Sequence, residues 1–200
     1  MLTNALVKLA AGDVLLWRTP IDLATAEFNI TGAARELYFL AQCAHESQSF
    51  SRLKENMRYS AARLLAVFPR YFTPSEAERM AYDERAIAER VYGGRMGNAI
   101  EGLGDGYRFI ARGALGITGR AMYERCGKAL GLPLLDQPEL LCAPVNAARS
   151  AAWFWKEHGC NELADAGDFL ATTKKINGGV NGQADREAWL AKLQAAAQSA

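Results

Sequence analysis

Apolar residues recur at helical spacing along most of the chain. Between Ala34 and Ala44 they lie three or four positions apart, which predicts a core-facing helix with Thr31 as its N-cap. The segment from Leu2 to Trp17 follows a similar pattern and predicts one amphipathic helix. The side chains expected on its buried side are Leu2, Leu6, Leu9 and Leu16.

Capping and proline signals place the remaining helices. Ser60 is expected to open a short helix over 61–68, and Thr73-Pro74-Ser75-Glu76 combines a capping box with a proline for a helix that runs to about Val91. Six glycines crowd residues 93–106, which predicts a long and functional loop. Further helices are expected at 119–131, from Pro144 through Trp155, at 162–174 and at 185–197, with a short β-like piece between 107 and 118. The chain should therefore be mainly α-helical with little β. Trp153 and Trp155 are expected in the core, with sugar-stacking platforms as the alternative.

Composition limits the class of protein. With 200 residues, half of them apolar, the chain can form a single domain over 1–200; residues 60–92 are the expected small lobe, and 1–59 with 93–200 the large one. A net charge of +1 gives no electrostatic case for general nucleic-acid binding. No apolar run approaches the roughly 20 residues of a membrane span, and no secretory signal is evident, so we expect synthesis in the cytoplasm.

The cysteines do not form a metal site. Cys43, Cys126, Cys142 and Cys160 are widely scattered without a Cys-x-x-Cys pair, and the only histidines are His45 and His158. This spacing argues against zinc. We expect buried or half-buried thiols, with a disulfide formed after release as the alternative.

Two glutamates give the chain its chemistry. Glu46 and Glu55 lie nine positions apart across a predicted helix end. Two carboxyl groups facing each other across a sugar-sized gap can hydrolyse a glycosidic bond. Each residue also has an ordinary alternative, since Glu46 fits an exposed helical position and Glu55 a solvated loop. His45-Glu46 is not a zinc-protease motif, because Ser49 stands where the second histidine is required.

Several further motifs follow in a fixed order. They are Val91-Tyr92-Gly93-Gly94-Arg95-Met96-Gly97-Asn98, Asp105-Gly106-Tyr107-Arg108-Phe109, Arg112-Gly113, Ile117-Thr118-Gly119-Arg120-Ala121-Met122-Tyr123, Ile176-Asn177-Gly178-Gly179-Val180-Asn181-Gly182 and Asp185-Arg186. Together with the glutamate pair, they resemble the family 19 glycoside hydrolases, and specifically their phage and prophage endolysin branch. The resemblance runs from roughly Ala34 to Trp189. The chain departs from it at Ala111, where the family has glycine, and at Gly116, where the family has a glutamine that lines the sugar cleft.

The resemblance implies a lysozyme-like, two-lobed helical domain with a central cleft. Its implied activity is inverting hydrolysis of β-1,4 bonds between N-acetylated amino sugars. Glu46 would protonate the leaving oxygen and Glu55 would deprotonate a water, with the carboxyl groups roughly 6.5–9.5 Å apart. Thr118 would hold that water or a sugar hydroxyl, or alternatively cap the next helix. No metal or organic cofactor is implied.

Four residues are expected to bind substrate. The resemblance places His45, Tyr59, Arg112 and Asn177 near the sugar chain. Arg112 would pair with a carboxylate and keep Glu55 ionised, or else be a surface arginine. Asn177 could donate to an N-acetyl group, although Asn-Gly is also ordinary turn chemistry. His45 could instead be a structural histidine, or one that supports the site without touching sugar.

The expected biological role is lysis of a bacterial host. The likeness to the short phage branch favours peptidoglycan over chitin, so the protein would be a monomeric endolysin whose partners are the glycan strands of the wall. It would act in the periplasm of a Gram-negative host after release through a separate holin-like factor. The alternatives are a chitinase and a non-catalytic wall-binding protein, the latter suggested by Ala111 and Gly116.

Overall fold

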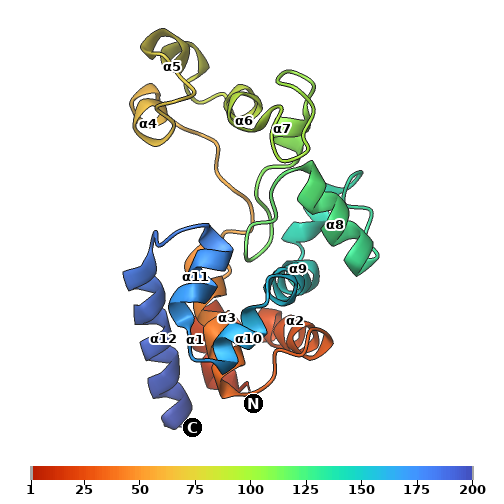
Figure 1. The fold of residues 1–200 in the computed structure, drawn as a ribbon, viewed down its shortest axis with the longest axis vertical. Coiled ribbons are helices and arrows are strands. Elements are labelled where there is room, and N and C mark those ends of the chain that lie inside the picture. Colours follow the sequence, from red (N-terminus) through yellow and green to blue (C-terminus); the bar gives the residue numbers. More distant parts are fainter. Residues whose placement is uncertain (1, 200) are drawn as a thin grey trace. The chain divides into compact units, whose positions relative to one another are not determined.

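The regular secondary structure of the described chain is almost wholly helical. The computed structural model describes residues 2–199, which form twelve α-helices and one 3-10 helix, without a strand longer than a single bridge residue (Figure 1). The prediction of a mainly α-helical fold is confirmed. The β-like piece predicted between 107 and 118 is wrong, because Gly113 and Gly116 have positive φ angles of 85° and 67° and turn the chain before a strand can extend.

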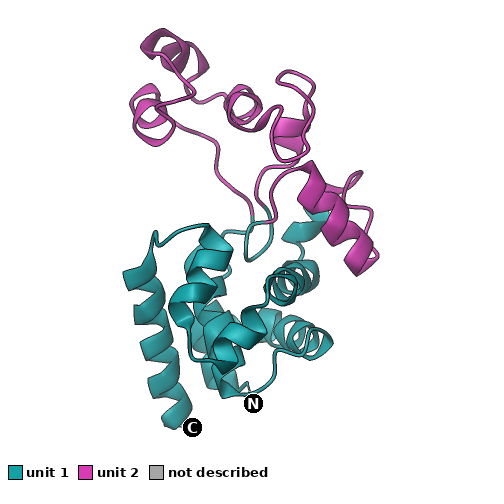
Figure 2. Cartoon of the chain, in the orientation of Figure 1, with its two compact units in different colours: residues 1–53, 112–116, 139–200 teal, residues 54–111, 117–138 magenta. Residues whose placement is uncertain are grey.

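The helices belong to two compact units (Figure 2). Unit 1 comprises residues 1–53, 112–116 and 139–200, and unit 2 comprises residues 54–111 and 117–138. The segment 60–92, set apart in the sequence as a small lobe, lies within unit 2. Each unit has its own buried apolar residues.

Unit 1 is organised around one central helix. Its α-helices are α1 (Asn4–Ala11), α2 (Val14–Glu27), α3 (Ala33–Glu46), α9 (Pro144–Glu157), α10 (Cys160–Asp165), α11 (Phe169–Asn177) and α12 (Gln183–Gln198). The 3-10 helix η1 (Pro138–Cys142) also belongs to unit 1, except for its first residue, Pro138, which ends unit 2. Helix α3 packs against α1, α9, α10, α11 and α12. The fully buried Trp155 of α9 meets Phe39 of α3 edge to face, with ring centroids 5.7 Å apart. Trp153 is also buried, so the prediction that both tryptophans belong to the core is confirmed.

Helix breaks in unit 1 differ from the prediction. The single helix expected from Leu2 to Trp17 is wrong, because Gly12, with φ of 74°, ends α1 and Asp13 caps α2. Leu16 is consequently 49% exposed rather than buried. Thr31 does not cap α3; Gly32 occupies that position without a side-chain cap. The helix expected at 162–174 is two helices, α10 and α11, because Asp168 caps a new start.

Unit 2 contains five helices and a small apolar core. The helices are α4 (Ala61–Val67), α5 (Pro74–Met80), α6 (Glu84–Tyr92), α7 (Asp105–Arg108) and α8 (Arg120–Leu130). The core residues are Met57, Leu64, Phe72, Ala77, Ile87, Ala88, Val91 and Ile110. The Ser60 cap and the Thr73–Glu76 capping box are confirmed. The helix expected to reach Val91 is interrupted, because Tyr82 adopts a φ of 65° and Asp83 caps α6 afresh.

The cysteines are thiols, as expected. Cys43, Cys126 and Cys160 are buried and Cys142 is half-buried. Burial raises the pKa of the Cys160 thiol to about 12 and raises that of Cys43 well above its usual range.

Within residues 2–199, no helix has the length and apolar character needed to cross a membrane.

Candidate active-site residues

Glu46 is the last residue of α3 in unit 1, and its carboxylate is paired with a buried arginine. The Glu46 side chain is 28% exposed, whereas that of Arg186 in α12 is 1% exposed. Arg186 Nη2 donates to Glu46 Oε1. A buried guanidinium is tolerated only beside acceptors that compensate for its lost hydration. The pair therefore fixes the direction of the Glu46 carboxyl group.

A chain of buried polar groups holds Arg186 in turn. Arg186 Nη1 donates to Gln42 Oε1, and Gln42 Nε2 donates to the hydroxyls of Thr172 and Thr173 in α11, at 3.2 and 2.9 Å. Both hydroxyls donate onward to a carbonyl in the first turn of that helix. Gln42, Thr172 and Thr173 are all 0% exposed. Because Gln42 and Glu46 lie four positions apart, α3 presents both acceptors to one guanidinium.

His45 contacts the start of α12 beside this pair. Its Nδ1 lies 2.6 Å from Asp185 Oδ2. A Cβ at Gly182 would lie 2.5 Å from Cε1 and Nε2 of the same ring, so no larger residue fits there without movement. The structure therefore places His45 against the residues that precede Arg186. A direct contact of His45 with substrate stays a prediction.

A left-handed turn begins two residues after Glu46. Gln48, Ser49 and Phe50 have φ angles of 50°, 58° and 60°, a conformation that costs L-residues roughly 1–2 kcal/mol each. The Ser47 hydroxyl accepts the Phe50 N–H at 2.8 Å, and the Phe50 ring packs on Trp17 with centroids 4.7 Å apart. Such strain persists only where surrounding contacts determine the conformation. The turn ends α3 directly after the candidate acid.

Glu55 lies in unit 2, in the extended stretch before α4, and it is fixed by backbone and side-chain contacts. Its N–H donates to the Ala111 carbonyl at 2.9 Å, and its Oε2 accepts the Ala111 N–H at 3.3 Å. The hydroxyl of Tyr92 donates to Oε1 at 2.8 Å and to Oε2 at 3.0 Å. Ala111 contributes only backbone atoms to these bonds. The departure from glycine at this position therefore does not remove them.

The electrostatic environment of Tyr92 keeps its phenol protonated. Burial raises the pKa of Tyr92, and the neighbouring Glu55 charge raises it further, against a smaller opposing effect of Arg95. A phenol in this state is a permanent hydrogen-bond donor. Tyr92 therefore serves Glu55 as a donor and does not compete with it as a base.

Thr118 is partly buried in unit 2, in a segment held by the glycine-rich loop. Asn98 donates to the Tyr92 carbonyl at 2.9 Å and accepts the Arg120 N–H at 2.7 Å. A Cβ at Gly119 would lie 2.4 Å from Met96 Cβ, so the loop and this segment touch closely. The alternative that Thr118 caps the next helix is wrong, because the N-cap of α8 is Gly119. Contact of Thr118 with water or sugar stays a prediction.

The other predicted binding residues are divided between the units. Arg112 and Asn177 belong to unit 1, where Arg112 is buried and Asn177 is the exposed last residue of α11. Tyr59 belongs to unit 2, packs against its core and meets Phe68 edge to face at 5.4 Å. The structure thus brings Glu55, Tyr59 and Thr118 into one unit. Their substrate contacts stay predictions.

The glycine-rich loop is anchored by one buried carboxylate. Glu89 in α6 is 6% exposed and accepts the N–H groups of Gly102, Gly104 and Tyr107 at 2.7–3.1 Å. Three backbone donors satisfy a carboxylate that would otherwise be costly to bury. The loop is therefore held at the α6 end that carries Tyr92.

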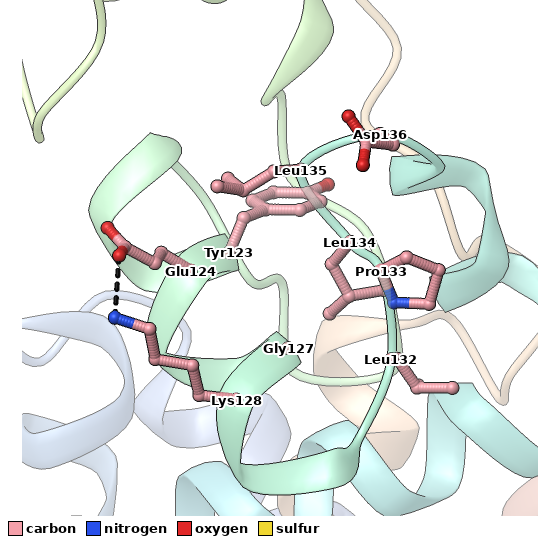
Figure 3. A pocket seen from close by; sticks show the side chains of 9 residues that line it. All are labelled: Tyr123, Glu124, Gly127, Lys128, Leu132, Pro133, Leu134, Leu135 and Asp136. Carbon is pink, nitrogen blue, oxygen red and sulfur yellow. Dashed lines mark hydrogen bonds and ion pairs between the residues drawn. The ribbon is translucent and has the colours of Figure 1, made fainter.

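A separate apolar pocket contains none of these residues. It has a volume of about 240 Å³ and lies between α8 and the chain that follows it, with Tyr123, Leu134 and Leu135 in its wall (Figure 3). A Glu124–Lys128 ion pair of 2.7 Å lies at its edge.

Across residues 2–199, no three His, Cys, Asp or Glu side chains are grouped so as to hold a metal ion.

Three contributors were missed in the sequence. Arg186 and Tyr92 stand inside the motifs Asp185-Arg186 and Val91–Asn98, but their partners lie 140 and 37 positions away. Gln42 is a polar residue one turn before Glu46 on a largely buried helix, and this was the one local signal. A buried polar group at that spacing indicates a side chain that shares its partner with the glutamate.

Comparison with known proteins gives the chain its relatives. Residues 92–182 match the family model described as class I chitinase, glycoside hydrolase family 19. A family 19 glycosyl hydrolase domain-containing protein of Haemophilus influenzae is 38% identical over 154 residues, which cover 76% of this chain and 74% of that protein. An endochitinase of Arabidopsis thaliana is 40% identical over 75 residues, covering 37% of this chain and only 26% of the plant protein.

Solved structures share the fold. Chitinase C from Streptomyces griseus has a TM-score of 0.64 at 20% identity, covering 97% of this chain and 75% of that one. A bacterial family 19 chitinase has a TM-score of 0.61 at 19% identity, covering 96% of this chain and 94% of that one. At this identity the likeness concerns the helical fold alone.

Proposed function

Because this chain belongs to the family 19 glycoside hydrolases, we propose that it cleaves β-1,4 glycosidic bonds of bacterial peptidoglycan as an endolysin. The observation that carries the proposal is that both candidate carboxylates are held by hydrogen bonds. Glu46 and Glu55 each receive hydrogen bonds from a residue distant in sequence, Arg186 and Tyr92. Fixed carboxyl groups are the requirement of acid–base hydrolysis at a sugar.

In the proposed reaction, the two carboxyl groups have opposite tasks. Arg186 holds Oε1 of Glu46, and Oε2 is the oxygen to which we assign the proton that passes to the leaving glycosidic oxygen. Glu55 takes a proton from water, whose oxygen then attacks the anomeric carbon from the opposite face. The C–O bond to the leaving sugar breaks, and the new C–O bond has inverted configuration. Thr118 is proposed to orient the water or a sugar hydroxyl.

Peptidoglycan is proposed as substrate on the pattern of relatives and motifs. A bacterial family member aligns over about three quarters of this chain, whereas the plant endochitinase match spans 37% of it. The ordered motifs also resemble the phage and prophage branch. Chitin is the alternative, favoured by the names of the plant relatives and of the solved structures.

The proposed setting follows from that substrate. A phage endolysin would be made in the cytoplasm as a monomer, would leave through a holin-like factor, and would act on glycan strands in the periplasm of a Gram-negative host. The catalytic mechanism itself requires no metal or organic cofactor. His45, Tyr59, Arg112 and Asn177 are the proposed substrate contacts.

Release of reducing ends tests the proposal. Purified peptidoglycan and soluble chitin oligomers would be incubated with the wild type, Glu46→Gln and Glu55→Gln. We expect peptidoglycan to be cleaved faster than chitin, with both variants reduced by at least about 10²-fold, the lower range for acid–base catalysis. Faster cleavage of chitin would overturn the substrate assignment. Binding of peptidoglycan without reducing ends from any of the three proteins would establish a wall-binding protein instead.

A further inference from the structure

Tyr92, the hydrogen-bond partner of Glu55, is held both by core packing and by its hydroxyl. The Tyr92 ring lies against the core of unit 2, but its hydroxyl reaches both oxygens of Glu55, at 2.8 and 3.0 Å. A hydroxyl carries one proton, so this geometry shares it between the two oxygens of one carboxylate. Charge-assisted hydrogen bonds of this kind are roughly twice as strong as neutral ones.

The backbone of Tyr92 is also fixed. Tyr92 ends α6, and its carbonyl accepts the Asn98 side-chain amide at 2.9 Å and the Arg95 N–H at 3.3 Å. A Cβ at the next residue, Gly93, would lie 2.6 Å from the Glu89 carbonyl oxygen, so the chain turns there in close contact. Ring, carbonyl and hydroxyl are therefore held together, and the donor is in place before any proton moves.

We propose that Tyr92 is a positioning residue for the general base, acting through Glu55 and without contact to substrate. It holds the carboxylate in one orientation through a charge-assisted hydrogen bond that reaches both of its oxygens. When Glu55 accepts a proton from water, Tyr92 keeps its own proton and its hydroxyl donates to whichever oxygen remains unprotonated. The inference rests on the proposed function, in which Glu55 is the base.

Two other groups influence the Tyr92–Glu55 pair, and a nearby tyrosine offers a control for the test. The other titratable or charged groups that act on the Tyr92 phenol are Tyr59, on the segment of Glu55, and Arg95, on the glycine-rich loop. Arg95 donates to the Tyr71 hydroxyl and lies over that ring. Tyr71 packs on the same core as Tyr92 and supplies a matched tyrosine hydroxyl without a bond to Glu55.

Tyr92→Phe removes only the hydroxyl, and Tyr71→Phe is its control. A hydrogen bond to a charged group contributes enough to move a titration by about one to two pH units. We expect Tyr92→Phe to shift the acidic limb of the kcat/KM profile on peptidoglycan fragments upward by that amount, with KM nearly unchanged. Tyr71→Phe should keep the wild-type limb. A Tyr92→Phe limb that coincides with wild type would overturn the proposal.

Two further measurements make the outcome independent of folding defects. Site-specific 3-fluorotyrosine at position 92 keeps the shape but is a stronger donor, so the acidic limb should move to lower pH; an unmoved limb contradicts the proposal. In a Glu55→Gln background, Tyr92→Phe should change the residual rate less than about twofold, because its effect passes through Glu55. A large additional loss would show that Tyr92 acts elsewhere.

Failure of this inference differs from failure of the proposed function. If Glu55→Gln is inactive while Tyr92→Phe has the wild-type profile, Glu55 is the base and Tyr92 only packs. If Glu55→Gln retains more than half of the activity, Glu55 is not the base and the proposed mechanism fails with the inference.

Discussion

Replacement of Gln42 by methionine should uncouple the buried arginine from its support. Gln42 accepts from Arg186 and donates to Thr172 and Thr173, and all of these side chains are at most 1% exposed. Methionine has a similar length without an acceptor suited to a guanidinium. The variant therefore leaves one face of a buried cation without its hydrogen bond.

The expected destabilisation follows from the groups that lose partners. Loss of a hydrogen bond to a charged group costs about 1.5–3 kcal/mol. For a chain of this size each kcal/mol lowers the melting temperature by about 2–4 °C, so a central value of about 2 kcal/mol corresponds to about 4–8 °C. Thr173→Val removes only neutral hydrogen bonds, the one accepted from Gln42 and a long one of 3.4 Å donated to the Phe169 carbonyl. It should cost about 1 kcal/mol, or about 2–4 °C.

Thermal unfolding by circular dichroism and hydrolysis at 25 °C measure the two consequences. Because Arg186 also directs Glu46, Gln42→Met should lower kcat at least about tenfold in protein that is still folded, as misplacement of a catalytic group does. Thr173→Val should lower stability with a smaller effect on kcat. A Gln42→Met protein with wild-type melting temperature and kcat would refute the claim that Gln42 supports the Arg186–Glu46 pair.

Other perturbations test neighbouring features. Gln48→Gly should raise stability by about 1 kcal/mol, since glycine relieves the left-handed conformation at an exposed position; a lower melting temperature would contradict the strain. Hydrogen bonds from Arg149 lower the pKa of Glu27 despite partial burial, so the pair stabilises the fold above the carboxyl's unfolded pKa and loses that effect as the pH falls through the folded pKa. The melting temperature of Glu27→Gln should therefore fall less between pH 7 and pH 3 than that of the wild type. An equal fall would contradict a stabilising Glu27–Arg149 pair. Cys142 should react with a thiol reagent before the buried Cys43 and Cys160 in native protein; simultaneous reaction would mean that labelling requires unfolding.

Helices were predictable where the local signal was strong. The capping box at Thr73 and the proline at Pro144 mark true helix starts. The capping box accepts free N–H groups of the first turn, and proline at the first turn has no N–H that would need a partner. Breaks were less predictable. Tyr82 interrupts a helical pattern with a φ of 65°, although tyrosine is not a typical turn residue. Gly12 ends a helix that the apolar spacing alone would continue.

The candidate glutamates were predictable, but their supports were not. Glu46 and Glu55 stand in recognisable motifs, whereas the contacts with Arg186 and Tyr92 depend on which helices pack together. Chain folding brings together residues 140 and 37 positions apart, and neither periodicity nor capping encodes such a pairing. Gln42 was the nearest local indication, since an amide buried one turn from a glutamate needs partners of its own.

The anomeric form of the first product tests the central claim most directly. Purified peptidoglycan glycan would be digested by wild-type protein and followed by proton NMR before the products mutarotate. If Glu46 protonates the leaving oxygen while Glu55 delivers water from the opposite face, as proposed, the first reducing ends released from a β-linked chain should be the α-anomer. Initial release of the β-anomer, or no reducing ends from folded protein, would contradict the two-glutamate inverting mechanism.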